Sequence, residues 1–270
     1  METIDIRESL LTCLGKFSGA EGETRDAREK SLEEPFRAIA TKLIHGGYFA
    51  VSDKADKDAV KYKIYIHSVE FYYHEEIEGD SRVCDWIMYH RNPLYGKKKE
   101  ALTTGSLYPH YSGIDITFED QQGKAENVRY RASALIRSFQ VTKVEGNNEN
   151  RVVFKDRPKH IVFDSKDVEN YVEYYPTHLP EYLLNKIQLP TIHIEWVDPK
   201  DPCEGEVYVG RRINVFEYNY FKDEKGRAHV ENKRVKKGAK ELKVPDMRRW
   251  AFCKEKITVK LEDQERFTFE

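Results

Sequence analysis

A single carboxylate lies among aromatic residues in the segment "KIYIHSVEFYYHEE", residues 63–76. Its alternation predicts a β-strand, and one face of that strand carries Ile64, Ile66, Ser68, Glu70 and Tyr72. An ionised carboxylate removed from water is costly unless it is paired or used in chemistry. Glu70 is therefore a candidate general base that activates a water molecule in a pocket. The alternative is a glutamate near a strand end that only faces solvent.

An arginine interrupts a second apolar strand, "ASALIRSFQV", at residues 132–141. A guanidinium inside such a strand needs an acceptor, because an unpaired buried charge is costly. Glu70 and Arg137 form a natural ion pair if both line one pocket. Otherwise Arg137 faces solvent from a strand at the edge of the sheet.

The segment "DWIMYHRN", residues 85–92, places His90 and Arg91 shortly after a tryptophan. These side chains are candidates for a polar and aromatic pocket wall. The alternative is that His90 is a structural or surface histidine, because one histidine near a tryptophan carries no specific chemistry by itself.

A third group of candidates lies in "TGSLYPHYSGIDITFE", residues 104–119. Tyr108, His110 and Tyr111 stand between two glycines, and an alternating strand that contains Asp115 follows them. Aromatic side chains held on a tight backbone can stack on a planar ligand such as a nucleobase. The alternative is a packed hairpin in which the tyrosines are core residues and the glycines form the turn.

Other chemistries find no motif in this sequence. The four cysteines are widely separated and form no CxxC pair, so neither a zinc site nor a disulfide framework is indicated. The simplest setting for such cysteines is a reducing, cytoplasmic one. Histidines 67, 74, 90 and 110 lack a metal-ligand spacing, and GxSxG, GxGxxG, HExxH and Walker A sequences are absent. We therefore expect no metal and no cofactor.

The formal net charge of −2 excludes a uniformly basic protein, but the cations are unevenly distributed. They concentrate in "RNPLYGKKK" (residues 91–99, with Lys97, Lys98 and Lys99), in "ENKRVKKGAKELK" (231–243, with Lys236 and Lys237) and in "MRRW" (247–250). Such segments can present one basic face to nucleic acid, although solvated loops are the alternative. The sequence contains no run of about 18 apolar residues, so we expect no membrane-spanning helix. Acidic residues near the N-terminus argue against a signal peptide.

The pattern along the 270 residues predicts one α+β domain that spans 1–270. A helical region covers 1–50, and the sheet core covers 61–144 and 208–262, with a lysine-rich loop inserted at 221–243. In the helical region, "KSLEEPFRAIATKLIHGG" predicts an amphipathic helix that two glycines end. A further short helix is predicted at 179–187. We expect a curved, mostly antiparallel sheet with N-terminal and peripheral helices.

The order of these motifs resembles that of the alkyladenine (3-methyladenine) DNA glycosylase family. The family reads Glu-Ala-Tyr, then Ala-His or Ser-His, then Gly-x-Leu-Tyr-Val-Tyr with a Tyr-Gly hairpin, then Leu-Leu-Arg. The matching segments here are "VEFYY", "DWIMYHRN", "GSLYPHYSG" and "ALIRSF". The later segments "GRRINV" and "MRRWAF" are similar to the family's closing Arg-Ile-Gly-Val and Pro-Trp-Arg-Phe strands. The resemblance covers about residues 61–141 and 208–252, and it implies the glycosylase fold.

The resemblance also implies roles for individual residues. Glu70 matches the glutamate that activates water for attack on the glycosidic carbon, and Arg137 matches the arginine that holds this water and the glutamate. The base-binding positions match Tyr72, His90, His110 and Tyr108, with Asp115 as the nearest match to a family asparagine. Tyr111 matches the tyrosine that fills the gap left by the flipped base. The other predicted DNA-binding residues follow from the basic segments and not from the resemblance, and they are Arg91, Lys97, Lys98, Lys99, Lys236 and Lys237.

The implied protein is a monofunctional DNA glycosylase without metal or cofactor, whose partner is double-stranded DNA in the cytoplasm, at the nucleoid. No membrane and no protein partner are expected. Departures from the family, notably Phe71 in place of a small residue and the insertion at 221–243, leave two substrates open. One is an alkylated purine, as in DNA repair. The other is a hypermodified cytosine of phage DNA, as in antiviral defence.

Two other classes of function stay open at the level of sequence. The first is a non-catalytic reader of modified bases on the same fold. The second is a hydrolase of small nucleosides, which needs neither duplex DNA nor Tyr111.

Overall fold

A computed structural model describes most of the chain. The described residues are 8–53, 55–76, 81–86, 88, 101–110, 113–120, 128–152, 161–163, 173–174, 192–199, 205–260 and 266–270. The helix predicted at 179–187 lies outside these residues.

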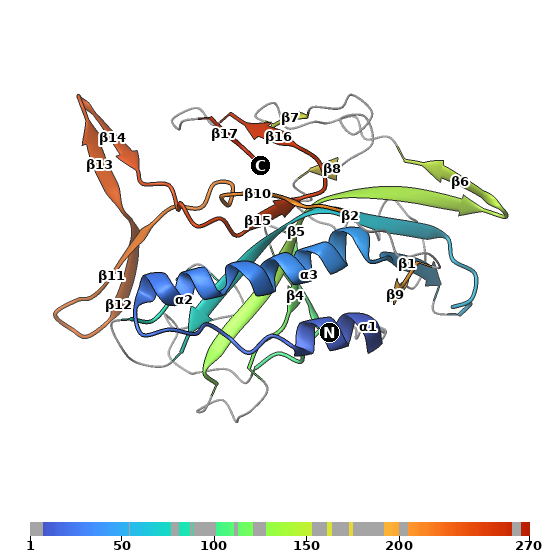
Figure 1. The fold of residues 1–270 in the computed structure, drawn as a ribbon, viewed down its shortest axis with the longest axis horizontal. Coiled ribbons are helices and arrows are strands. Elements are labelled where there is room, and N and C mark those ends of the chain that lie inside the picture. The colour runs from blue at the N-terminus through green and yellow to red at the C-terminus, as the bar shows by residue number, and fades with distance from the viewer. Residues whose placement is uncertain are drawn as a thin grey trace.

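Two long antiparallel strands, β2 and β5, form the centre of the main sheet and pair along almost their whole length (Figure 1). The sheet runs in the order β10-β15-β2-β5-β4-β3, with β1 on β2, β9 on β1, and both β6 and β8 on β5. The bounds of these strands are β1 Tyr48–Asp53, β2 Tyr62–Glu75, β3 Leu107–His110, β4 Gly113–Thr117, β5 Tyr130–Glu145, β6 Asn148–Arg151, β8 Glu173–Tyr174, β9 Ile192–Val197, β10 Tyr208–Gly210 and β15 Ala251–Cys253.

One face of the sheet is apolar and is covered by the N-terminal helices α1 (Glu8–Gly15) and α3 (Glu33–His45), whereas α2 (Arg25–Ser31) between them buries no residue. The ring of Phe36 in α3 stacks on Phe71 of β2 at a centroid distance of 4.4 Å. Trp250 meets Phe36 edge-on at 5.4 Å. Helix α3 ends at Gly46, whose N–H still bonds to the carbonyl oxygen of Lys42. The predicted amphipathic helix and its glycine stop are confirmed.

A smaller apolar cluster forms on the opposite face of the sheet. Ala251 and Cys253 of β15 pack there with Ile213 and Ile257. The cluster is completed by a three-stranded sheet of β7 (Ile161–Phe163), β16 (Ile257–Val259) and β17 (Phe267–Thr268). In the sheet, Ala251 is paired with Glu70 of β2 and Cys253 with Ser68. This second cluster therefore excludes water from the face of the sheet that carries the candidate site.

The prediction of a lysine-rich loop at 221–243 is wrong, because this segment folds as β-hairpins. One pairs β11 (Tyr218–Lys222) with β12 (Ala228–Asn232), and the other pairs β13 (Arg234–Lys237) with β14 (Lys240–Lys243). Gly226 and Gly238 adopt positive φ in the two turns, a conformation that glycine tolerates. Solvent on both faces of β13 removes the apolar alternation by which strands are recognised in sequence.

The coarse prediction is confirmed: the described residues form an α+β fold with mostly antiparallel sheets and few helices. Strands β1 and β9 extend the main sheet beyond the predicted ranges of 61–144 and 208–262. Among the described residues, no helix is long and apolar enough to span a membrane.

Candidate active site

The alternation of β2 shifts by one residue at His67. Ile64 and Ile66 before the shift, and Val69 after it, all belong to the apolar cluster beneath the helices. The prediction that Ile64 and Ile66 share a face with Glu70 is therefore wrong. An extra residue in one strand reverses the faces that follow it, and Glu70 consequently lies on the face away from the helices.

Strand β5 carries a matching irregularity at Arg137. Ser138 pairs with Ser68, and their hydroxyl oxygens lie 2.6 Å apart, but Arg137 is skipped in the register. A bulge of this kind turns a side chain in a new direction. Arg137 points to Glu70, with 3.3 Å between its Nε and the Oε2 of the carboxylate. The ion pair predicted from the two separate strands is confirmed.

The Glu70 carboxylate is buried, with 1 % of the residue exposed, and it is held by donors from three directions. Oε1 accepts from the backbone N–H of Ile213 at 2.7 Å. Oε2 accepts from the hydroxyl of Tyr72 at 3.1 Å and faces Arg137. Burial first, and then the charge of Glu70, raises the pKa of Tyr72 well above its usual value, so its hydroxyl stays protonated and donates.

Arg212 holds the other side of Tyr72. Its guanidinium lies 4.7 Å from the centroid of the tyrosine ring and donates to the carbonyl oxygen of Phe71 at 3.1 Å. It is fully buried and forms ion pairs with Asp85 and, at 2.6 Å, with Asp246. Because Arg212 precedes Ile213, two adjacent residues orient both the ring of Tyr72 and the carboxylate of Glu70.

The network around Arg212 was not predicted, although one signal was visible. An arginine in "GRRINV" stands beside apolar residues and needs a buried acceptor, by the same reasoning that identified Arg137. Burial alone would raise the pKa of Asp246, but the nearby charges of Arg212 and Arg248 lower it below its usual value. Asp246 therefore remains an anion that compensates both guanidinium groups.

Asp115 and Tyr108 share the face of the sheet that carries Glu70. Glu70 and Asp115 are both paired with Leu135 of β5, from its two sides, and Tyr108 is paired with Asp115. Directly paired side chains project from the same face, so Glu70, Asp115 and Tyr108 lie in one row across four strands. With strands about 4.8 Å apart, Glu70 and Asp115 are separated by about 10 Å, and the buried side chain of Leu135 projects between them.

Several predicted site residues fall outside the described part of the chain. They are His90, Arg91, Lys97, Lys98, Lys99 and Tyr111. The backbone of His110 pairs with Gly113 at the end of the β3–β4 hairpin, but its side chain is not among those described. Lys236 and Lys237 are exposed on β13, away from Glu70. The structure thus brings Glu70, Arg137 and Tyr72 into contact, whereas Asp115 and Tyr108 share only the row of the sheet.

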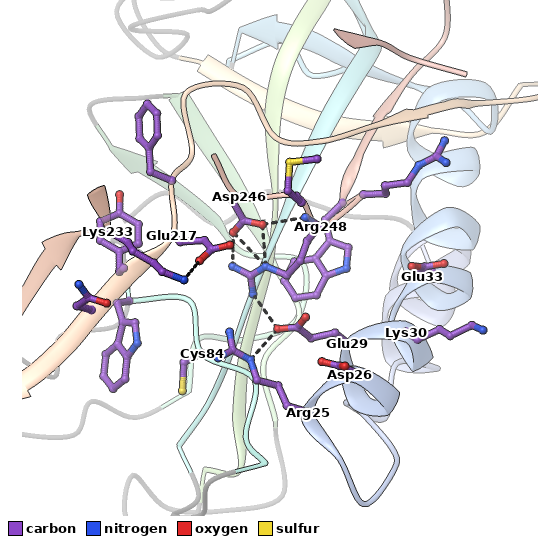
Figure 2. Close-up of a pocket in the computed structure, with 17 residues that line it drawn as sticks. Arg25, Asp26, Glu29, Lys30, Glu33, Cys84, Glu217, Lys233, Asp246 and Arg248 are labelled. Carbon is purple, nitrogen blue, oxygen red and sulfur yellow. Dashed lines mark hydrogen bonds and ion pairs between the residues drawn. The ribbon is translucent and has the colours of Figure 1, made fainter. Parts of the chain in front are cut away.

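A polar cavity of about 820 Å³ lies next to this site, between α2, the start of β11 and the segment 246–250 (Figure 2). Its charges alternate: Arg25 pairs with Glu29 at 3.0 Å, Glu29 lies 3.9 Å from Arg248, and Arg248 pairs with Asp246. Asp246 joins the cavity to the Arg212 network. The cavity does not include Glu70 and was not predicted. Among the described residues, no cluster of three or more side chains is arranged to bind a metal ion.

The bulge residue His67 gives the structure a testable pH dependence. Burial, followed by the charges of Lys254, Arg151 and His45, lowers the pKa of His67 to about 3. His67 is therefore neutral in the fold, whereas below pH 6.5 it is protonated in the unfolded chain. Proton binding to the unfolded state lowers the free energy of unfolding as the pH falls, by about 2 kcal/mol between pH 7 and pH 5.

We expect His67→Gln to remove this component. Denaturant unfolding of both proteins at pH 7 and pH 5 measures it: the native protein should lose about 2 kcal/mol more than the variant over this range. Equal losses would contradict the buried, neutral state of His67.

Comparison with known proteins adds no assignment: no protein-family model, no curated protein and no solved structure matches the chain.

Proposed function

We propose that this chain is a monofunctional DNA glycosylase with the fold of the alkyladenine DNA glycosylase family. The observation that carries the proposal is the contact of three separate motifs. Glu70, Arg137 and the backbone of Ile213 come from "VEFYY", "ALIRSF" and "GRRINV", and they meet at one buried carboxylate. The resemblance gives these segments the catalytic glutamate, its arginine and a closing strand.

In the proposed reaction, Glu70 accepts a proton from a water molecule as the water oxygen attacks C1′ of the target nucleotide. The bond between C1′ and the base nitrogen breaks, and its electron pair leaves with the base. A base that would leave as an anion takes up a proton, and the proton held by Glu70 returns to solvent. The products are a free base and an abasic site. Arg137 supplies positive charge beside Glu70, and the donors from Tyr72 and Ile213 fix the direction of the carboxylate. No cofactor takes part.

The flipped base would stack against Tyr72, His90 and His110, with Tyr108 and Asp115 on the row that leads away from Glu70. One ring face of Tyr72 meets Arg212, so the guanidinium sets the orientation of the stacking surface. Duplex DNA is the proposed partner, contacted by Tyr111 in the gap left by the base and by Arg91, Lys97, Lys98, Lys99, Lys236 and Lys237 along the phosphates.

One departure from the family pattern, the large residue Phe71, lies outside the proposed base pocket. Phe71, which replaces a small residue, packs under α3 against Phe36 and not on the side of Glu70. Its size therefore does not narrow the proposed base pocket. The substrate remains either an alkylated purine or a hypermodified cytosine of phage DNA, with repair or antiviral defence as the respective role.

A non-catalytic reader of modified bases is the second candidate, and one observation favours it. Both oxygens of Glu70 already accept hydrogen bonds from the protein, and 1 % of the residue is exposed. A general base needs one of these oxygens within reach of a water molecule. If Ile213 and Tyr72 keep these hydrogen bonds when DNA is bound, Glu70 cannot contact a water molecule. Glu70 and Arg137 are then a structural ion pair in the wall of a binding pocket.

A cleavage screen separates the two candidates. Duplexes that each carry one type of alkylated purine or hypermodified cytosine are incubated with the protein and then treated with alkali. We expect strand breaks at one class of modified base, because abasic sites are alkali-labile. Tight binding of a modified duplex that stays intact would support the reader and contradict the enzyme.

A further inference from the structure

The β13–β14 hairpin, here named the basic ribbon (residues 234–243), stands out from the sheet body at one end of the molecule (Figure 1). It holds five cations and one acid, which are Arg234, Lys236, Lys237, Lys240 and Lys243 against Glu241. The adjacent β11–β12 hairpin is balanced, with Lys222, Lys225 and Arg227 against Asp223, Glu224 and Glu231. Positive charge is therefore concentrated on the basic ribbon.

The register of the basic ribbon places like charges opposite each other. Arg234 is paired with Lys243 across the strands, and Lys237 is paired with Lys240 beside the turn. Direct cross-strand pairs of equal charge destabilise a sheet. Among the described residues, Arg234 meets Glu241 at 3.5 Å, whereas no carboxylate pairs with Lys237 or Lys240. An anionic partner would relieve this repulsion.

The shape of the basic ribbon selects among anionic partners. A two-stranded ribbon fits the major groove of B-form DNA, which is about 12 Å wide and about 8.5 Å deep. Four residues per strand span about 13 Å, so the basic ribbon is long enough to reach the floor of that groove. Between the two cation pairs lie the opposite-charge pair Lys236 and Glu241 and the apolar pair Val235 and Leu242, of which Val235 is 51 % exposed. Apolar side chains at this position can contact thymine methyl groups.

The root of the basic ribbon is firmly connected to the candidate active site. The N–H of Glu217 bonds to the carbonyl oxygen of Val244 at 2.9 Å, and the N–H of Asp246 bonds to that of Val215 at 3.0 Å. Asp246 then pairs with Arg212, which contacts the ring of Tyr72. A short chain of fixed contacts therefore links the basic ribbon to the proposed base pocket.

We propose that the basic ribbon enters the major groove of the duplex that flanks the flipped base, with Lys236, Lys237 and Lys240 on the phosphates along the groove. This inference rests on the proposed function as a DNA-binding protein. It adds entry into the major groove to the phosphate contacts already proposed for the basic residues.

The test compares two variants matched in charge. One carries Lys236→Ala, Lys237→Ala and Lys240→Ala, and the control carries Lys222→Ala, Lys225→Ala and Arg227→Ala on the balanced hairpin. Affinity for an unmodified 20-base-pair duplex is measured by fluorescence anisotropy against salt concentration. The basic ribbon variant should reduce the salt slope by about 2 to 3, since each lost phosphate contact contributes about 0.9. The control should keep the native slope.

Dimethyl sulfate footprinting tests the groove itself, because the reactive guanine N7 lies in the major groove. The native protein should protect guanines beside its binding site, and the basic ribbon variant should lose this protection. Duplex RNA of the same sequence should show little difference between the proteins, since its major groove is too narrow for a ribbon.

Unchanged slope and protection in the basic ribbon variant would overturn the inference. So would an equal loss of affinity for duplex RNA, which would indicate phosphate contacts without entry into the groove. A native protein that binds no duplex DNA would contradict the proposed function itself, so the two failures are distinguishable.

Discussion

Glu70→Gln is expected to lower the rate of base release by about 10² to 10⁴-fold, the range that general-base catalysis contributes. Glutamine has nearly the same shape but cannot accept the proton of the attacking water. Affinity for the duplex should stay within a few fold, because the glutamate is buried and makes no phosphate contact. Single-turnover base release and anisotropy on the same modified duplex measure the two quantities.

Glu119→Gln is the matched control for this variant. Glu119 is also a buried carboxylate of the main sheet region, and it pairs with Arg131 at 2.7 Å. Its replacement should cost stability but leave base release intact. Substantial remaining activity in Glu70→Gln, or an equal loss in Glu119→Gln, would contradict the assignment of Glu70 as the general base.

Arg212→Met is expected to lower the free energy of unfolding by about 3 to 5 kcal/mol, the cost of removing one partner from a buried ion pair. Methionine replaces the length of the side chain but leaves the carboxylates of Asp85 and Asp246 without their central cation. The ring of Tyr72 should also be held less firmly in this variant, because the guanidinium that contacts it is gone. Denaturant unfolding at pH 7 measures the change in stability.

Arg227→Met is the control, because it removes the cation of an ion pair that is exposed to solvent. Arg227 pairs with Asp223 on the β11–β12 hairpin, but 68 % of its side chain is accessible to solvent. Exposed pairs contribute about 0.2 to 1 kcal/mol, so this variant should unfold almost like the native protein. Similar losses for Arg212→Met and Arg227→Met would show that the buried network does not hold the site together.

Strong local patterns explain what could be predicted of the fold. The helix that became α3 was visible because its apolar residues recur with helical spacing and two glycines follow it. The β3–β4 hairpin was visible from the glycine at its turn and the alternation after it. The basic ribbon was missed as strands because polar residues on both faces leave no alternation to read.

The candidate site was predictable only where one residue conflicted with its own strand. Glu70 and Arg137 each violate an apolar pattern, and their contact followed from that conflict. The bulge at His67 was not predictable, because an extra residue leaves the sequence looking like a regular strand with its faces exchanged. The Arg212 network was missed since Asp85, Arg212 and Asp246 are far apart in the chain, and spacing carries no information about such contacts.

The central claim is that this protein hydrolyses the bond between a modified base and its sugar. Chromatography of the free base, released from a duplex with one alkylated purine or hypermodified cytosine, tests it most directly. We expect free base to accumulate in a one-to-one ratio with alkali-labile sites, and to disappear with Glu70→Gln. A stable complex that yields neither free base nor abasic sites on any of these duplexes would contradict the claim.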